Sequence, residues 1–116
     1  MEKPYIVRNC NDVTAVPCPC GQARRVLTSA DTDLLSVHRV RISRTAKVHY
    51  HNKLTEFYVI LSGSGAIVLN GERIQVKPND VIMIPPGTRH ALEGEFDIIN
   101  IVCPPFDPSD EHLANE

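Results

Sequence analysis

The stretch HYHNKLTE, residues 49–56, carries the pattern from which both the fold and the functional site are predicted. Side chains two apart on a β-strand point to the same face, so His49 and His51 present two imidazole rings to one point. Glu56 begins the next strand-like run after a gap of only four residues. This gap is short enough to fold the chain back and place a carboxylate opposite the two rings.

A third histidine, His90, follows the turn-forming sequence PPGT and would bring another imidazole from a distant strand. Three neutral imidazoles and one carboxylate suit one divalent transition metal ion, either Fe, Mn, Ni, Zn, Co or Cu, and would leave coordination positions open for water or substrate. The alternative is that the histidines are scattered over the surface. We expect a metal site of His49, His51, Glu56 and His90, because all four fall around turns that would bring them together.

Short apolar runs rich in β-branched residues lie on both sides of this stretch, and no window of helical length carries a 3.6-residue stripe. This pattern predicts an all-β fold. Asn70-Gly71 is typical of a two-residue hairpin turn, and SGSG at 62–65 and KPND at 77–80 punctuate other runs. Strands at such regular spacing indicate a jelly-roll or sandwich-like barrel. The predicted strands are 5–9, 24–29, 34–43, 48–51, 55–61, 65–69, 72–76, 81–84, 90–93 and 96–103.

The length of 116 residues and the hydrophobic share of 42% fit one domain with one core. We expect a single domain over residues 1–116, with its barrel core at about 24–103. Residues 10–23, which contain three cysteines and two prolines, look like an irregular loop. Residues 104–116 are Pro-rich and then acidic, and we expect a flexible tail there.

The formal net charge of -2 gives no cationic surface for nucleic acid or an anionic membrane, so we expect neither partner. No apolar run approaches the ~18 residues of a membrane-spanning helix, and the N-terminus lacks a signal-peptide pattern, so we expect a cytoplasmic protein. Its four cysteines should then be reduced. They are Cys10, Cys18, Cys20 and Cys103. Cys18-Pro19-Cys20 is most simply a rigid loop, with an oxidisable thiol pair and a second metal site as alternatives.

The two histidine-containing stretches resemble the two motifs of the cupin family of small β-barrels. The first motif reads His-x-His, a short gap, Glu, six residues and Gly, and it is matched from His49 to Gly63. The second reads Pro-x-Gly-x-x-His and is matched from Pro85 to His90. Together the motifs span about residues 43–94. The resemblance implies a double-stranded β-helix (jelly-roll) barrel with a metal site of three histidines and one glutamate.

Three positions depart from the family pattern. The glycine often found six residues before the first histidine is Ser43, the usual opening glycine of the second motif is Asp80, and the asparagine often found four residues after its histidine is Gly94. These are structural positions in the family, so the ligands are unaffected, whereas assignment to one subfamily is weakened. Cupins commonly pair through a barrel face and an N-terminal strand, so the resemblance also implies a homodimer that exchanges residues 5–9.

Strand alternation places three candidate residues in the pocket beside the metal. Tyr58 shares a face with Glu56, His38 lies on the apolar face of its predicted strand, and Asn100 interrupts an apolar run. Each has a plainer alternative: a core tyrosine with a satisfied hydroxyl, a satisfied core histidine, and an amide bonded to nearby backbone. Four further cations are explained either by a solvated outer face or by an anionic substrate at the barrel mouth: Arg39, Arg41, Arg44 and Lys47.

Two functions are compatible with this site. In the first, the protein is a metal-dependent enzyme that acts on a small molecule, and the resemblance implies the range of dioxygenases and isomerases. In the second, the same site captures or senses a small molecule such as a sugar or carboxylate without catalysis. The fold alone does not separate them, because function belongs to the site. A basic group near the open metal positions, such as Tyr58 or His38, would favour the enzyme.

Overall fold

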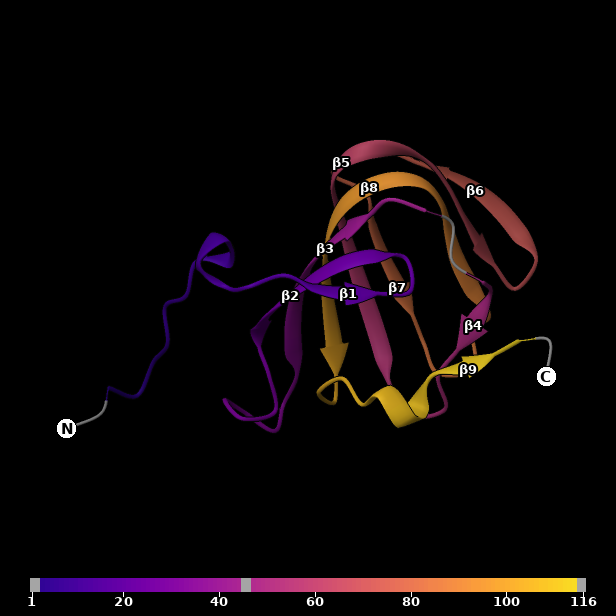
Figure 1. Ribbon diagram of the computed structural model, residues 1–116. Helices are drawn as coiled ribbons and strands as arrows, with labels where there is room; N and C mark the ends of the chain where they lie inside the picture. Colours follow the sequence, from indigo (N-terminus) through magenta and orange to yellow (C-terminus); the bar gives the residue numbers. More distant parts are fainter. Residues whose placement is uncertain (1–2, 45–46, 115–116) are drawn as a thin grey trace.

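The computed structural model describes residues 3–44 and 47–114 and confirms the all-β prediction (Figure 1). In this part of the chain the strands form one curled antiparallel sheet in the order β1-β2-β3-β8-β4-β9, with β5 pairing to β6, β7 and β8. The strands are β1 (Val16–Cys18), β2 (Gly21–Leu27), β3 (Ser36–Ile42), β4 (His49–Tyr50), β5 (Thr55–Leu69), β6 (Glu72–Val76), β7 (Val81–Ile84), β8 (His90–Cys103) and β9 (His112–Leu113). Two short 3-10 helices, η1 (Cys10–Asp12) and η2 (Pro108–Asp110), complete the elements.

The two longest strands, β5 and β8, pair along almost their whole length, from Thr55 opposite Cys103 to Leu69 opposite His90. Both bow strongly in the middle (Figure 1). The sequence predicted a turn at residues 62–65 and two separate strands on each side of the bend. The structure shows one continuous strand in each case, because the two strands stay paired through the glycines. The register shifts by one residue at Leu61, which forms a β-bulge beside the bend.

Gly63 and Gly94 show why glycine is required at this bend. Both have φ in the left-handed region, +101° and +125°. A Cβ on Gly63 would overlap the carbonyl oxygen of Glu95, and a Cβ on Gly94 would meet the carbonyl oxygen of Ser64 at 2.6 Å. Gly94, which departs from the family pattern, therefore has a structural role of its own in this chain.

The bend brings together residues from opposite ends of the β5–β8 ladder. Glu56 lies at one end of it, and His90 pairs with Leu69 at the other, 13 residues further along β5. In a straight strand this separation would be about 40 Å. Instead, the Nε2 atom of His90 lies 3.1 Å from the Oε1 atom of Glu56. The curl of the sheet thus joins the two sequence motifs.

The hairpin predicted at Asn70-Gly71 is confirmed. Leu69 pairs with Glu72, so the loop between β5 and β6 contains two residues. Both have positive φ, 48° for Asn70 and 85° for Gly71, as a type I′ turn requires.

A continuous apolar core fills part of the barrel interior. Its largest fully buried side chains include Phe96, Ile60, Ile67 and Ile98, each with an exposed fraction of 1% or less. They come from the inward faces of β5 and β8. Burial of this apolar area is the main favourable term for folding.

Three expectations about the ends of the chain are corrected. Residues 5–9 form no strand in the described structure; they run away from the barrel, and Val7 is 92% exposed (Figure 1). Apolar sequence alone does not make a strand where no sheet edge is within reach. Residues 10–23 are not an irregular loop throughout, because they contain η1, β1 and the start of β2.

The predicted flexible tail also has regular structure in its described part, residues 104–114. It contains η2 and β9, and β9 pairs with β4. The carboxylate of Asp110 is buried and accepts hydrogen bonds from the backbone N–H groups of Asn52, Lys53 and Leu54 at 2.9–3.1 Å. The tail therefore holds the loop between the first two histidines and Glu56. This long-range role of one aspartate has no local signal in the sequence.

Among the described residues, no helix has the length and apolar character needed to cross a membrane.

Candidate metal centre

The first two predicted ligands lie where strand alternation places them. His49 is on β4 and His51 directly follows it. The Nδ1 atom of His49 lies 3.0 Å from the backbone carbonyl oxygen of Lys47. A carbonyl only accepts, so Nδ1 carries the proton and Nε2 keeps a free lone pair. Burial among these rings lowers the pKa of His49, which favours the neutral form that binds metals.

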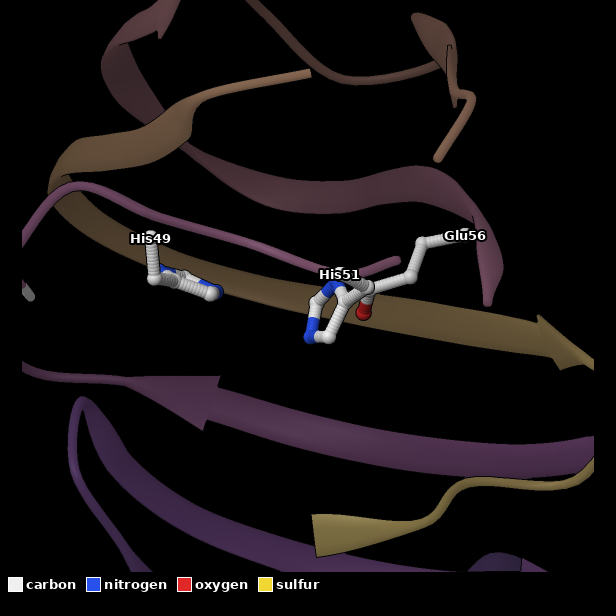
Figure 2. A group of neighbouring side chains, drawn as sticks. All are labelled: His49, His51 and Glu56. Atoms are coloured by element: carbon white, nitrogen blue, oxygen red, sulfur yellow. The ribbon is translucent and has the colours of Figure 1, made fainter. Parts of the chain in front are cut away.

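Glu56 lies at the centre of the group. Its side chain is buried, and Oε1 is 3.2 Å from Nδ1 of His51 and 3.1 Å from Nε2 of His90. Figure 2 shows its carboxylate beside the ring of His51. Burial raises the pKa of Glu56, but His90, His51 and the amide of Asn100 more than offset this and lower the pKa below its usual value. The site therefore holds Glu56 as a carboxylate.

His90 is completely buried, and its Nδ1 donates to the backbone carbonyl of Thr88 at 2.9 Å. In the neutral form of the ring its Nε2 atom bears a lone pair, and this atom faces the acceptor oxygen of Glu56 at 3.1 Å. Two acceptors at this distance repel each other unless a proton or a metal cation lies between them. This arrangement fits a bound cation.

His49, His51 and Glu56 have ligand atoms that all lie within 4.8 Å of one another (Figure 2). His90 stands outside this tight group of three, but its ring centroid is 4.3 Å from that of His49. Imidazole nitrogens and one carboxylate are the donors that divalent transition metals prefer. The three residues could therefore hold a metal ion, and no ion identity follows from the donors alone.

A cavity of about 550 Å³ opens beside these side chains, and all three predicted pocket residues line it: His38, Tyr58 and Asn100. They belong to one row across the sheet, because His38 pairs with Asn100 and Asn100 pairs with Tyr58. Asn100 donates from Nδ2 to Oε2 of Glu56 at 2.6 Å, while its own Oδ1 is buried without a partner. Asn100 thus fixes the orientation of the Glu56 carboxylate. The alternative in which its amide bonds to nearby backbone groups is therefore wrong for Nδ2.

Tyr58 and His38 are both uncharged at neutral pH. Burial and the nearby carboxylate of Glu56 raise the pKa of Tyr58 well above 10.0, so its hydroxyl keeps its proton. Burial, followed by the charge of Arg25, lowers the pKa of His38 to about 4. The cavity wall thus offers a neutral phenol and a neutral imidazole.

Arg25, Phe106 and Glu111 are among the cavity residues that the sequence analysis missed. Arg25 had a local signal, since it alternates with buried Ala23 on β2 and so faces inward. Phe106 and Glu111 had none, because they lie in the segment expected to be a flexible tail. Glu111 Oε1 lies 3.6 Å from Nε2 of His49 at the rim of the cavity.

The cations expected at the barrel mouth mostly lie elsewhere. Arg39 pairs with Asp97 at 2.9 Å, and Arg39 and Arg41 do not line the cavity. The simpler alternative, an outer solvated face, therefore holds for both. Lys47 does line the cavity.

The four cysteines form no disulfide. Cys18 is the last residue of β1, and Cys20 lies in the two-residue turn that leads to β2. Their sulfur atoms are 3.7 Å apart, and both residues line the cavity. Burial raises the pKa of Cys20 to about 12, so this thiol is a poor nucleophile. The rigid-loop interpretation agrees with this geometry better than a reactive thiol pair.

The chain matches the family model of the cupin domain over residues 37–100, more than half of its length, and it belongs to the cupin family. It is 33% identical over 78 residues to the uncharacterised protein MJ1618 of Methanocaldococcus jannaschii. That match covers 64% of this chain and spans 62% of the length of that relative.

Two solved structures extend the comparison over nearly the whole chain. A protein from Planctomyces limnophilus is 40% identical, with 96% of this chain and 97% of that chain covered and a TM-score of 0.90. Pac13 from Streptomyces, described as a nucleoside dehydratase, is 21% identical, with 95% and 91% covered and a TM-score of 0.81. At this identity the likeness to Pac13 shows the fold alone: a cupin β-barrel, as the motifs predicted.

Proposed function

We propose that this protein binds one divalent transition metal ion through His49, His51, Glu56 and His90, and that it is a metal-dependent enzyme acting on a small molecule in the adjoining cavity. One observation supports the metal most directly. His49 and His90 each donate Nδ1–H to a backbone carbonyl, which leaves the Nε2 atom of each neutral ring available to a metal ion beside Glu56. Such outer hydrogen bonds are typical of metal-binding histidines.

When bound, the ion supplies Lewis acidity that polarises a substrate oxygen. The protein groups around it perform the remaining tasks. Asn100 holds Glu56 in one orientation, and the apolar wall formed by residues such as Val40 and Ile98 limits the access of water. Tyr58 keeps its proton and can donate a hydrogen bond to a substrate oxygen. These features are compatible with a reaction of the isomerase type, and similarity to the fold of a dehydratase is also compatible with it.

The metal site is tested by elemental analysis of protein purified without a metal-affinity tag. We expect close to one transition metal ion per chain, lost in the His49→Ala/His51→Ala variant and kept in His112→Ala. His112 is a suitable control because it bonds to Asn52 and Asp110 at the rim and lies outside the ligand group. Protein without metal, or metal retained by the double variant, contradicts the proposal.

Catalysis is tested with the metal-loaded protein against small phenols, diketones, thiols and sugars, with and without dioxygen. Turnover that persists without dioxygen and falls in Tyr58→Phe supports the reaction of the isomerase type. Oxygen consumption coupled to substrate loss instead indicates a dioxygenase. Binding without turnover across the whole panel contradicts catalysis and favours a protein that captures or senses a small molecule.

A further inference from the structure

Arg25 places a positive charge in the cavity without a carboxylate to balance it. It lies on β2 and lines the same cavity as the metal-ligand candidates. No carboxylate of residues 3–44 or 47–114 forms an ion pair with it. Three other arginines do have such partners: Arg8 with Asp31, Arg39 with Asp97 and Arg73 with Glu93.

The guanidinium of Arg25 is nevertheless held in place. Its Nη1 donates to Nδ1 of His38 at 3.3 Å, because a guanidinium has no acceptor atom. The proton of the imidazole is therefore on Nε2, which donates to the hydroxyl of Ser36 at 2.8 Å. Both ring nitrogens of His38 are thus engaged, so its role is to position Arg25.

Phe106 forms the second support. The carbon atom at the centre of the Arg25 guanidinium lies 5.0 Å from the centroid of the Phe106 ring. The backbone N–H of Phe106 donates to the hydroxyl of Ser36 at 2.8 Å, so Ser36 connects the two supports. A guanidinium has five N–H donors, and His38 uses one of them. The remaining donors form a preoriented fork that suits a carboxylate or phosphate.

Once a divalent ion is bound, the charges in the cavity also favour an anion. Arg25 and Lys47 contribute two positive charges, and Glu56 and Glu111 contribute two negative charges. A divalent ion beside Glu56 would therefore leave an excess of two positive charges. A low-dielectric cavity with such an excess attracts small anions.

We propose that Arg25 forms an anion subsite, and that the cavity takes a small organic anion whose carboxylate or phosphate group is held by Arg25 while another part of it faces the metal centre. The contact with the metal centre rests on the proposed function, whereas the contact with Arg25 does not. Because Arg25 and the metal-ligand candidates line the same cavity but bind different groups, the ligand must carry an anionic group separate from its reacting group. The arginines on the outer face have no part in this recognition.

The test uses titrations followed by the amide shifts of the ¹⁵N-labelled protein, as purified and after removal of metal. The probes are butyrate, methylphosphonate and the neutral butyramide. We expect both anions to bind, butyramide not to bind, and the largest shifts to occur in β2 and β3. Arg25→Gln should weaken anion binding about ten- to a hundredfold. Arg41→Gln, which removes an outward-facing arginine on β3, should leave it unchanged.

Stronger binding of butyrate indicates a carboxylate ligand, and stronger binding of methylphosphonate indicates a phosphate ligand. Equal affinity for butyrate and butyramide, or equal affinity in the wild type and Arg25→Gln, overturns the subsite. Arg25→Lys keeps the positive charge but lacks the forked guanidinium, and it serves as a second variant. If neither variant folds, the wild-type titration alone is used: amide shifts that lie mainly outside β2 and β3 overturn the anion subsite at Arg25. The titration of metal-free protein, together with elemental analysis of each sample, shows whether anion binding at Arg25 depends on the metal ion. The anion subsite and the proposed metal site can therefore fail independently.

Discussion

The inward face of the two long strands changes character within a few residues. On β5, Glu56 lines the cavity, whereas Ile60 is completely buried in the core. On β8, Asn100 lines the cavity, whereas Phe96 is completely buried. The barrel interior thus has a cavity half, which contains the metal centre and Arg25, and a packed half built around Phe96.

The difference teaches that stability and function are separated along the same strands. Buried polar groups cost free energy unless they are paired, so the cavity half depends on a dense set of hydrogen bonds. The packed half has no such need and supplies apolar burial. Changes in the packed half should therefore reduce stability without altering the metal centre, whereas changes in the cavity half should alter the metal centre and should also reduce stability where they leave buried donors without a partner.

The largest effect on stability is expected from Phe96→Ala in the packed half. Removing this completely buried ring leaves a cavity and should lower the free energy of unfolding by about 3–5 kcal/mol. Denaturant unfolding measures this loss, and the metal content of the folded protein should stay unchanged. Leu61→Ala, at a side chain 41% exposed on β5, is the control and should cost much less. Equal losses in both variants would show that the inward-facing Phe96 contributes no more to stability than the partly exposed Leu61.

Asp110 connects the tail to the loop that carries the cavity half, and its replacement should have the next largest effect. Burial raises its pKa, but the backbone donors of Asn52, Lys53 and Leu54 more than offset this and lower the pKa to about 2, from 3.8. Asp110→Ala leaves these donors without their partner and should cost about 1–3 kcal/mol. Chemical denaturation checks this value, with Asp33→Ala as an exposed control.

The same aspartate predicts a pH dependence. A carboxyl whose pKa is lower in the folded state contributes stability above its unfolded pKa, and this contribution is lost as the pH falls. The difference in unfolding free energy between the wild type and Asp110→Ala should thus be constant above about pH 5 and shrink between pH 4 and pH 2. A difference that stays constant through this range would rule out the charge of Asp110 as the cause.

Replacement of Asn100 should have a smaller effect, and this effect should appear in metal affinity rather than in stability. Its amide orients Glu56, and loss of such an outer hydrogen bond typically weakens metal binding about 10- to 100-fold. Competition with a chelator, comparing the wild type with Asn100→Ala, measures this change. Gln22→Ala on β2, exposed and outside the cavity, is the control. Unaltered affinity in Asn100→Ala would remove the positioning role of this residue.

The smallest effect on the fold is expected on the outside of the barrel. Val81 and Met83 on β7 are 67% and 60% exposed and lie opposite Val59 and Phe57 of β5. We propose that a second copy of the chain covers this apolar patch, as the predicted homodimer requires. Val81→Lys/Met83→Lys should convert dimer to monomer in light scattering and leave metal content unchanged. A monomeric wild type, or a variant that remains dimeric, contradicts the predicted dimer.

Much of the fold and the site was predictable because the relevant signals are local. Two-residue alternation placed His49 beside His51 and Tyr58 beside Glu56, and Asn70-Gly71 marked its hairpin. The predictions were wrong for segments whose structure depends on residues that are distant in the sequence. Glycines taken as a turn became a bend because a second strand continues beside them, and a tail without apolar character became ordered through Asp110.

The sequence alone determined the strand periodicity and the donor types at His49, His51, Glu56 and His90, because both are encoded within a few residues. Only the tertiary structure decided which donors meet. Glu56 and His90 lie at opposite ends of a long ladder and come within 3.1 Å because that ladder curls at its glycines. Arg25 likewise lines the same cavity as the metal-ligand candidates only because β2 and β3 form part of the wall of that cavity. Curvature and closure are properties of the whole sheet, so no short stretch of sequence contains them.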